Sequence, residues 1–193
     1  MRIVSGIFKN RPLKVPTGKS TRPSSAKLRS AIFDSCQGEI EGLDVLDIFA
    51  GSGAIGFEAL SRGAQSVSFI ENNRKAIDCI RENAKNLGVE KRISILQGDF
   101  SKELKRLEKE ESSFSFIYAD PPYQQKIDWQ GSQLLYSECV LQIMDRSDIL
   151  QKGSKLFIEE GSQESLQVDK LLNLHFHKQK KYGAGTLWRF SRT

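Results

Sequence analysis

Short apolar runs alternate with longer amphipathic segments along the chain from residue 43 onward. Five runs have the length and composition of buried strands: 43–49, 66–71, 92–97, 114–119 and 154–160. Four intervening segments show helical spacing: one that follows a glycine-rich turn and reaches about Ser61, one from about Asn73 to Leu87, 101–111 and 131–146. This alternation predicts an α/β fold with a mostly parallel sheet and helices on both of its faces.

The two ends of the chain depart from this alternation. Mixed polar and apolar stretches flank Gly183-Ala184-Gly185, which predicts an antiparallel hairpin that closes the sheet. The segment 1–42 contains three prolines and then a predicted helix, about Ser24 to Cys36, whose apolar residues recur at a spacing of four. We therefore expect a basic N-terminal extension at 1–42 and a main domain at 43–193.

The composition is that of a globular protein. The chain has 193 residues, 38% hydrophobic and 27% charged, which suits one domain with a core rather than a disordered chain. No apolar run approaches the roughly 20 residues that span a bilayer, and the N-terminus lacks the pattern of a signal peptide. Cys36, Cys79 and Cys139 lie far apart, so we expect reduced thiols in a cytoplasmic protein without a metal site.

The positive charge is concentrated at the N-terminus. Eight of the 29 basic residues precede Asp34, the first acidic residue, and the remaining 21 are outnumbered by 24 acidic residues. This asymmetry predicts a polyanionic partner, nucleic acid rather than membrane, although a solvated arm that aids solubility is the alternative. The residues expected to contact RNA are Arg2, Lys9, Arg11, Lys14, Lys19, Arg22 and Arg29.

A glycine-rich turn follows the first predicted strand. Residues 47–56 read DIFAGSGAIG, so Gly51, Gly53 and Gly56 form G-x-G-x-x-G between a strand and a helix. Glu71 ends the next strand, where a carboxylate can accept hydrogen bonds from the two hydroxyls of a ribose. The turn alone suits NAD as well as S-adenosylmethionine.

Two further acids favour S-adenosylmethionine. Asp47 precedes the glycines, where a negative charge would attract an ammonium group, and Asp99 could accept from an adenine amine while Phe100 packs against the ring. Each acid also has a structural interpretation, Asp47 as a partner of the following helix dipole and Asp99 as a helix N-cap. The residues expected around the cofactor are Asp47, Phe49, Ala50, Gly51, Gly53, Glu71, Asn72, Asp99 and Phe100.

The fourth predicted strand ends unusually, in FSFIYADPPY over residues 114–123. Pro121 and Pro122 have fixed φ and lack an N–H, so this turn presents the Asp120 carboxylate and bare carbonyls as acceptors. Acceptors without donors suit a planar NH₂ group, because its two hydrogens need two acceptors. The ring of Tyr123 can stack on the ring that carries this NH₂ group. A proline-rich strand exit with a surface aromatic is the structural alternative. The candidate catalytic residues are Asp120, Pro121, Pro122 and Tyr123.

These motifs together resemble a known family. FAGSG with DPPY resembles S-adenosylmethionine-dependent amino-methyltransferases, and the N-terminal RIVSG…RPL…RPSSAKLRSAIFD is similar to the RsmD family of bacterial guanine-N2 methyltransferases of 16S ribosomal RNA. The resemblance covers essentially the whole chain. It implies a Rossmann-like fold with a seven-stranded sheet, S-adenosylmethionine around the glycine turn, and the target guanine of ribosomal RNA or the small ribosomal subunit at Asp120–Tyr123.

Alternative functions share the same motifs. An adenine-N6 methyltransferase of RNA or DNA also uses D-P-P-Y, a protein-glutamine methyltransferase usually has asparagine in place of Asp120, and a non-catalytic RNA-binding protein would need neither motif. His175 and His177 share a strand face and are expected to be exposed rather than metal ligands. Residues 124–131 are either a mobile loop on the substrate side or a loop over a packed Trp129. We expect a monomer.

Overall fold

The computed structural model describes residues 1–16, 26–36 and 39–193. The chain divides into two compact units, Met1–Glu103 and Leu104–Thr193. The predictions made for Lys19, Arg22 and Ser24 lie outside the described residues. The expected boundary at residue 42 is not where these units divide. That residues 1–42 act as a substrate-binding extension stays a prediction.

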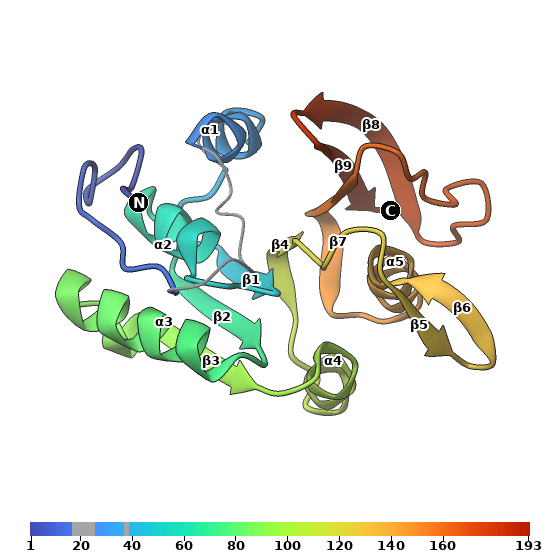
Figure 1. Cartoon of the computed structure of the whole chain (residues 1–193), viewed down its shortest axis with the longest axis horizontal. Coiled ribbons are helices and arrows are strands. Elements are labelled where there is room, and N and C mark those ends of the chain that lie inside the picture. The colour runs from blue at the N-terminus through green and yellow to red at the C-terminus, as the bar shows by residue number, and fades with distance from the viewer. Residues whose placement is uncertain (17–25, 37–38) are drawn as a thin grey trace. The chain divides into compact units, whose positions relative to one another are not determined.

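Three parallel strands form the sheet of the first unit: β1 (Asp44–Ile48), β2 (Ser66–Glu71) and β3 (Ile93–Gln97). They lie side by side in the order β3-β2-β1 (Figure 1). Their helices are α1 (Ala26–Asp34), α2 (Ala54–Ser61), α3 (Arg74–Leu87), the 3₁₀ turn η1 (Glu90–Arg92) and the beginning of α4 (Phe100–Lys109). β1 and α2 are almost entirely buried, as their near-continuous apolar sequences predict.

Local sequence signals set the ends of α3. Asn73 caps its N-terminus by accepting from the amides of Lys75 at 2.9 Å and Ala76 at 3.4 Å. Gly88 ends it with a φ of 70°, a left-handed conformation that glycine adopts without strain. The helix therefore occupies the span predicted from the sequence to within one residue.

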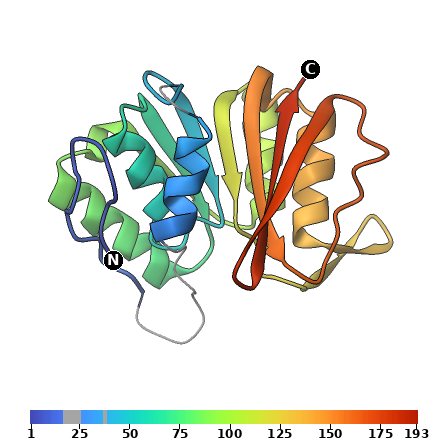
Figure 2. The same ribbon diagram turned by 90° about the horizontal axis from the view of Figure 1, so that it is seen from above.

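The second unit has four strands in one sheet. β4 (Phe114–Ala119) pairs in parallel with β7 (Leu150–Gly161), and β9 (Gly185–Arg192) runs antiparallel to β7 and to β8 (Leu174–Tyr182). Figure 2 shows β8 and β9 as the expected C-terminal hairpin, and α5 (Tyr136–Arg146) accompanies this sheet. The predicted alternation of parallel strands and helices, followed by an antiparallel hairpin, is confirmed.

One predicted helix begins later than expected. The spacing predicted a helix over 131–146, whereas β5 (Lys126–Trp129) and β6 (Ser132–Leu135) form an antiparallel hairpin before α5. Gln130 and Gly131 make its turn with φ values of 52° and 81°, and the Gly131 amide donates to Asp128 Oδ1 at 3.1 Å. The short polar strands lack an apolar run, so they carry little sequence signal.

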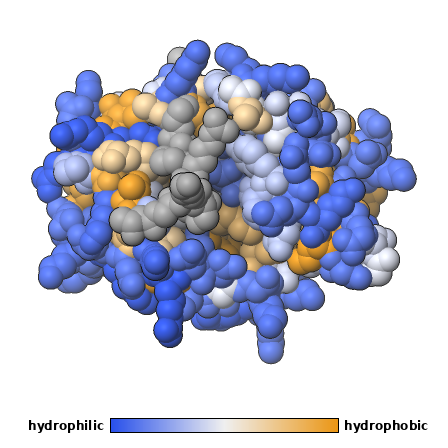
Figure 3. Space-filling model, in the orientation of Figure 1, coloured by the Kyte–Doolittle hydropathy of each residue, from blue (hydrophilic) through white to orange (hydrophobic). Residues whose placement is uncertain are grey.

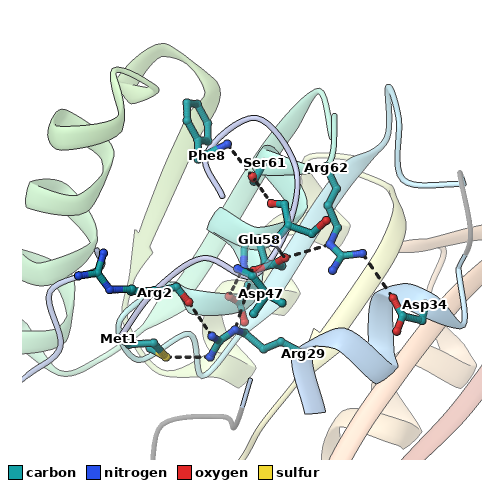
Figure 4. A network of polar contacts seen from close by, with 12 residues as sticks. Met1, Arg2, Phe8, Arg29, Asp34, Asp47, Glu58, Ser61 and Arg62 are labelled. Atoms are coloured by element: carbon teal, nitrogen blue, oxygen red, sulfur yellow. Dashed lines mark hydrogen bonds and ion pairs between the residues drawn. The ribbon is translucent and has the colours of Figure 1, made fainter. Parts of the chain in front are cut away.

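The N-terminal segment packs against α2 within the first unit. Ile3 and Leu13 are buried, and the amides of Val4 and Ser5 donate to the Glu58 carboxylate at 2.8 and 2.9 Å. Figure 4 shows the buried Glu58 at the centre of this network. Residues 1–16 are therefore a packed part of the unit rather than a detached arm.

Candidate functional site

The glycine turn between β1 and α2 has a backbone that few other residues adopt. Gly51 and Gly53 have φ values of 57° and 76°. A Cβ on Gly53 would lie 2.7 Å from the Phe57 ring, and one on Gly56 would lie 2.3 Å from the Phe69 ring, so both positions require glycine for packing. A Cβ on Gly51 would meet nothing within 4 Å. Gly51 is thus the glycine of this turn whose surroundings leave room for a ligand.

Glu71, at the end of β2, is tied to the backbone around it. Its Oε2 accepts from the Gly51 amide at 2.7 Å, and its Oε1 accepts from the amides of Asn72 and Asn73, each at 2.9 Å. A carboxylate has about four acceptor positions, of which three are occupied here. Glu71 can therefore accept a hydrogen bond from one ribose hydroxyl and keep all three bonds from the backbone amides.

Asp47 lies inside the end of β1. It is 2% exposed, and its Oδ2 accepts from the Gly56 amide in the first turn of α2 at 3.1 Å. Burial, and to a lesser degree the nearby Glu71, raise the pKa of this carboxyl well above its usual range, although the Gly56 amide opposes the shift. These contacts agree with the structural interpretation of Asp47, and its attraction for an ammonium group stays a prediction.

Asp99 and Phe100 lie where α4 begins. Asp99 Oδ1 accepts from the Ser101 amide at 3.0 Å, the Ser101 hydroxyl at 2.6 Å and the Lys102 amide at 3.3 Å, which is how an N-cap acts. Phe100 is 3% exposed, and its ring centroid lies 5.0 Å from that of Phe49. The ring of Phe100 supports Phe49, and a direct contact between Phe100 and adenine stays a prediction.

The DPPY sequence follows β4 in the second unit. Asp120 is half-buried, Pro121 is buried and Tyr123 is half-buried. The Tyr123 hydroxyl donates to Glu159 Oε1, and the Tyr118 hydroxyl donates to Glu159 Oε2 at 2.7 Å. Burial raises the pKa of Tyr123 strongly, and the charges of Asp120 and Glu159 add to the shift, so the phenol stays neutral and acts as a donor.

The sequence interpretation missed Glu159 and its neighbour Glu160. Both are buried near the end of β7, directly after a run of apolar residues. Two successive acids directly after the apolar residues of a predicted strand were the signal that could have identified them, because buried carboxylates need hydrogen-bond donors.

The basic residues of the N-terminal segment differ in exposure. Arg2, Lys9, Arg11 and Lys14 are exposed. Three of them also make contacts: Arg2 donates to the Asn10 carbonyl and Arg11 to the Asn86 carbonyl, each at 2.7 Å, and Lys14 pairs with Glu82 at 2.5 Å.

Arg29 does not lie where the RNA hypothesis requires it. Its side chain is 2% exposed, donates to the Arg2 carbonyl at 2.8 Å, and lies 4.0 Å from the Glu58 carboxylate (Figure 4). The prediction that Arg29 contacts RNA is wrong, because the first residues of the chain and Glu58 of α2 enclose its guanidinium group.

Other sequence features have structural roles. The rings of His175 and His177 meet edge to face at 4.8 Å, and the described residues contain no group of three or more potential metal ligands. Trp129 is half-buried in β5, with Lys105 Nζ 6.0 Å from its ring centroid.

No helix within the described ranges is long and apolar enough to cross a membrane. Hydrophilic residues predominate on the face drawn in Figure 3.

Comparison with known proteins identifies related sequences. The family model described as conserved hypothetical protein 95 matches residues 1–191. YlbH of Bacillus subtilis is 39% identical over 126 residues, which cover 65% of this chain and 68% of that protein. Ribosomal RNA small subunit methyltransferase D of Haemophilus influenzae is 28% identical over 135 residues, which cover 70% of each protein.

Solved structures share the fold of the chain. The yhhF protein of Escherichia coli has a TM-score of 0.81 at 23% identity, covering 100% of this chain and 97% of that one. SMU.776, solved as a complex with S-adenosylhomocysteine, has a TM-score of 0.69 at 11% identity, covering 95% of this chain and 52% of that one. These likenesses confirm the predicted Rossmann-like methyltransferase fold.

Proposed function

Since the chain belongs to the family described as conserved hypothetical protein 95, the RsmD family that its sequence resembles, we propose that it methylates ribosomal RNA. Within that activity we propose transfer of a methyl group from S-adenosylmethionine to the exocyclic N2 of a guanine in 16S ribosomal RNA. The observation that carries the proposal is the family match over residues 1–191 together with the DPPY sequence directly after β4.

The residues of the first unit fit S-adenosylmethionine. The open position at Gly51 and the remaining acceptor position on Glu71 suit a ribose, and the relative solved with S-adenosylhomocysteine supports the same ligand class. When bound, S-adenosylmethionine supplies an electrophilic methyl group on a sulfonium. The residues proposed to hold it are those expected from the sequence: Asp47, Phe49, Ala50, Gly51, Gly53, Glu71, Asn72, Asp99 and Phe100.

Asp120 is the residue proposed to activate the exocyclic amine of the target base. The lone pair of an exocyclic amine is delocalised into the ring, which makes the nitrogen a poor nucleophile. The Asp120 carboxylate and a carbonyl of the Asp120-Pro121 turn accept the two N2 hydrogens and stabilise the positive charge that develops on the nitrogen. The nitrogen takes the methyl group as its bond to sulfur breaks, S-adenosylhomocysteine is released, and N2 loses one proton to Asp120 or to water. Holding the nitrogen in line with the methyl group supplies much of the rate.

Tyr123 contributes its ring rather than its hydroxyl. The hydroxyl donates to Glu159, so it is not available to donate to the base. A guanine that has left its stack regains part of the stacking energy on the aromatic face. This division of roles agrees with a ring platform beside the Asp120 acceptors.

Exposed cations of the N-terminal segment are proposed to bind RNA phosphates. Lys9 is exposed, and Arg2, Arg11 and Lys14 are exposed with partners that a phosphate could replace. The partner proposed is 16S ribosomal RNA or the small-subunit particle.

The test is methylation of small ribosomal subunits that lack the modification, with labelled S-adenosylmethionine and identification of the labelled nucleoside. We expect N2-methylguanosine from the wild-type protein and no product from Asp120→Ala, which should still bind S-adenosylmethionine. The exposed Asp169→Ala serves as the control and should remain active. N6-methyladenosine, label confined to protein, or RNA binding without any transfer would each replace the proposal with the corresponding alternative.

A further inference from the structure

Strand β7 ends with two successive buried carboxylates. Glu159 is 7% exposed and Glu160 is 0% exposed. Successive residues of a strand point to opposite faces of the sheet, so the two side chains leave β7 on different sides. Burying a carboxylate is unfavourable unless hydrogen bonds replace those made to water. In both cases the segment that follows the two prolines of DPPY provides part of that compensation.

Glu159 joins two tyrosines. Its Oε1 accepts from the Tyr123 hydroxyl, and its Oε2 accepts from the Tyr118 hydroxyl at 2.7 Å. Tyr118 is 1% exposed within β4, so it is a fixed point of the sheet. Through this carboxylate the half-buried Tyr123 is held to the buried core of the second unit.

Glu160 holds the next residue of the same turn. Its Oε1 accepts from the Gln124 amide at 3.0 Å and from the Gly161 amide at 2.6 Å, and its Oε2 accepts from the Ser137 hydroxyl in α5 at 2.7 Å. Gln124 has a φ of 60°, which is uncommon for a residue other than glycine and persists where surrounding contacts hold it. The turn is thus fixed by its backbone as well as by the Tyr123 hydroxyl.

The hairpin of β8 and β9 leaves no spare room around this contact. Gly185 pairs with Gly161 across β7 and β9. A Cβ on Gly185 would lie 2.7 Å from the Tyr123 hydroxyl oxygen and 2.8 Å from Glu159 Oε1. Glycine at this position is therefore needed for the tyrosine and the carboxylate to meet.

We propose that Glu159 and Glu160 are positioning residues that hold the Tyr123 ring and the Gln124 turn in the geometry that receives the target base. The inference rests on the proposed function, in which the Tyr123 ring stacks on that base. Because the ring is fixed before the substrate arrives, binding does not have to order it, and the free-energy cost of association is smaller. Neither acid touches substrate, and each acts through the turn.

Steady-state kinetics on the small-subunit particle test the role of Glu159. We expect Glu159→Ala to lower kcat/KM by about 10-fold or more, the usual effect of removing a hydrogen bond to a charged group, while affinity for S-adenosylmethionine is unchanged. Glu159→Gln keeps an acceptor for the Tyr123 hydroxyl and should restore most of the activity. Asp169→Ala, at an exposed position, is the control and should keep the kcat/KM of the wild type.

A double-mutant cycle separates positioning from a general loss of structure. If Glu159 acts through the Tyr123 hydroxyl, Glu159→Ala adds little to the effect of Tyr123→Phe on kcat/KM. Fully additive effects, or a Tyr123→Phe variant with unchanged kcat/KM, would overturn the proposal. Tyr123→Phe retains the ring volume, so it keeps the test decisive if Glu159→Ala does not fold.

A readout independent of activity distinguishes this proposal from the proposed function. The Tyr123 hydroxyl is bound to Glu159 in the free protein, so the Tyr123 ring has one fixed environment. The near-ultraviolet circular dichroism that is lost in Tyr123→Phe should therefore also be lost in Glu159→Ala and retained in Glu159→Gln. A Glu159→Ala spectrum identical to that of the wild type would overturn the positioning role of Glu159. Loss of the Tyr123 signal in a protein that methylates no ribosomal particle would refute the proposed function and leave the positioning role standing.

Discussion

Glu71 Oε2 accepts the amide hydrogen of Gly51 at 2.7 Å, so the end of β2 fixes the glycine turn that follows β1. Replacing Glu71 with glutamine removes the charge and one acceptor atom from this contact. We expect the affinity for S-adenosylhomocysteine, measured by titration calorimetry, to fall by about 10-fold or more. The exposed Glu90→Gln in η1 is the control and should bind normally. Equal affinities in all three proteins would remove Glu71 from the cofactor site.

Asp47 predicts a pH-dependent stability. The pKa of its carboxyl is raised in the folded protein, mainly by burial, so between its unfolded and folded pKa values the folded state retains a proton that the unfolded state has released. Stability therefore falls as the pH rises through this interval. Asp47→Asn removes this penalty and still accepts from the Gly56 amide, so its melting temperature should exceed that of the wild type increasingly as pH rises above the usual carboxyl range.

Thermal melts at several pH values check this expectation. Asp169→Asn, at an exposed position, is the comparison and should follow the wild type at every pH. A difference between Asp47→Asn and the wild type that is constant with pH would contradict the raised pKa. Weaker binding of S-adenosylmethionine by Asp47→Asn would support the additional role predicted from the sequence.

The buried Arg29 should matter for folding rather than for RNA. Arg29→Met removes a cation that lies 4.0 Å from Glu58 and donates to the Arg2 carbonyl. Breaking such a buried pair should lower the free energy of unfolding by about 2–3 kcal/mol, less than an unshared pair because Arg62 still contacts Glu58 at 3.0 Å. Urea denaturation measures this decrease. Unchanged stability with weaker RNA binding would restore Arg29 to the RNA surface.

The exposed cations of the N-terminal segment should set the salt dependence of RNA binding. Replacing Lys9, Arg11 and Lys14 together by alanine should weaken binding and lower the slope of log affinity against log salt by about 0.7–0.9 for each phosphate that the variant no longer binds. The matched control replaces three other exposed lysines, Lys91, Lys102 and Lys109. If both triple variants change the slope equally, the effect reflects net charge and not a binding surface.

Elements with strong local signals were predictable from the sequence. Asn73 and Gly88 mark the ends of α3 because caps depend on neighbouring residues alone. The apolar runs of β1, β2 and β4 predicted their strands closely because buried parallel strands are nearly continuous in hydrophobicity. The DPPY turn was also predictable from local sequence, because each proline fixes its own φ and removes its own N–H whatever the rest of the fold does.

Roles that depend on distant residues were not predictable in this way. The sequence grouped Arg29 with the exposed basic residues of the N-terminal segment. Its burial depends on Glu58, in a helix that comes later in the chain. Glu58 lies within the otherwise apolar AIGFEALS of α2, a sign that its carboxylate would need a buried partner. The role of Glu159 depends on contacts across β4 and β9, which no spacing rule contains.

The fit of Gly185 against Tyr123 has a consequence for sequence comparison and genetic screening. In a saturation screen scored by methylation, substitutions of Gly185 should lower activity, because a Cβ there would displace the Tyr123 hydroxyl or the Glu159 carboxylate. Its neighbour Gly183 has a φ of 64° but open space around it, so replacements there should be recovered as mildly unstable, active proteins. The hairpin of β8 and β9 therefore contains one position whose identity would indicate whether a divergent homologue has kept the contact between Tyr123 and Glu159.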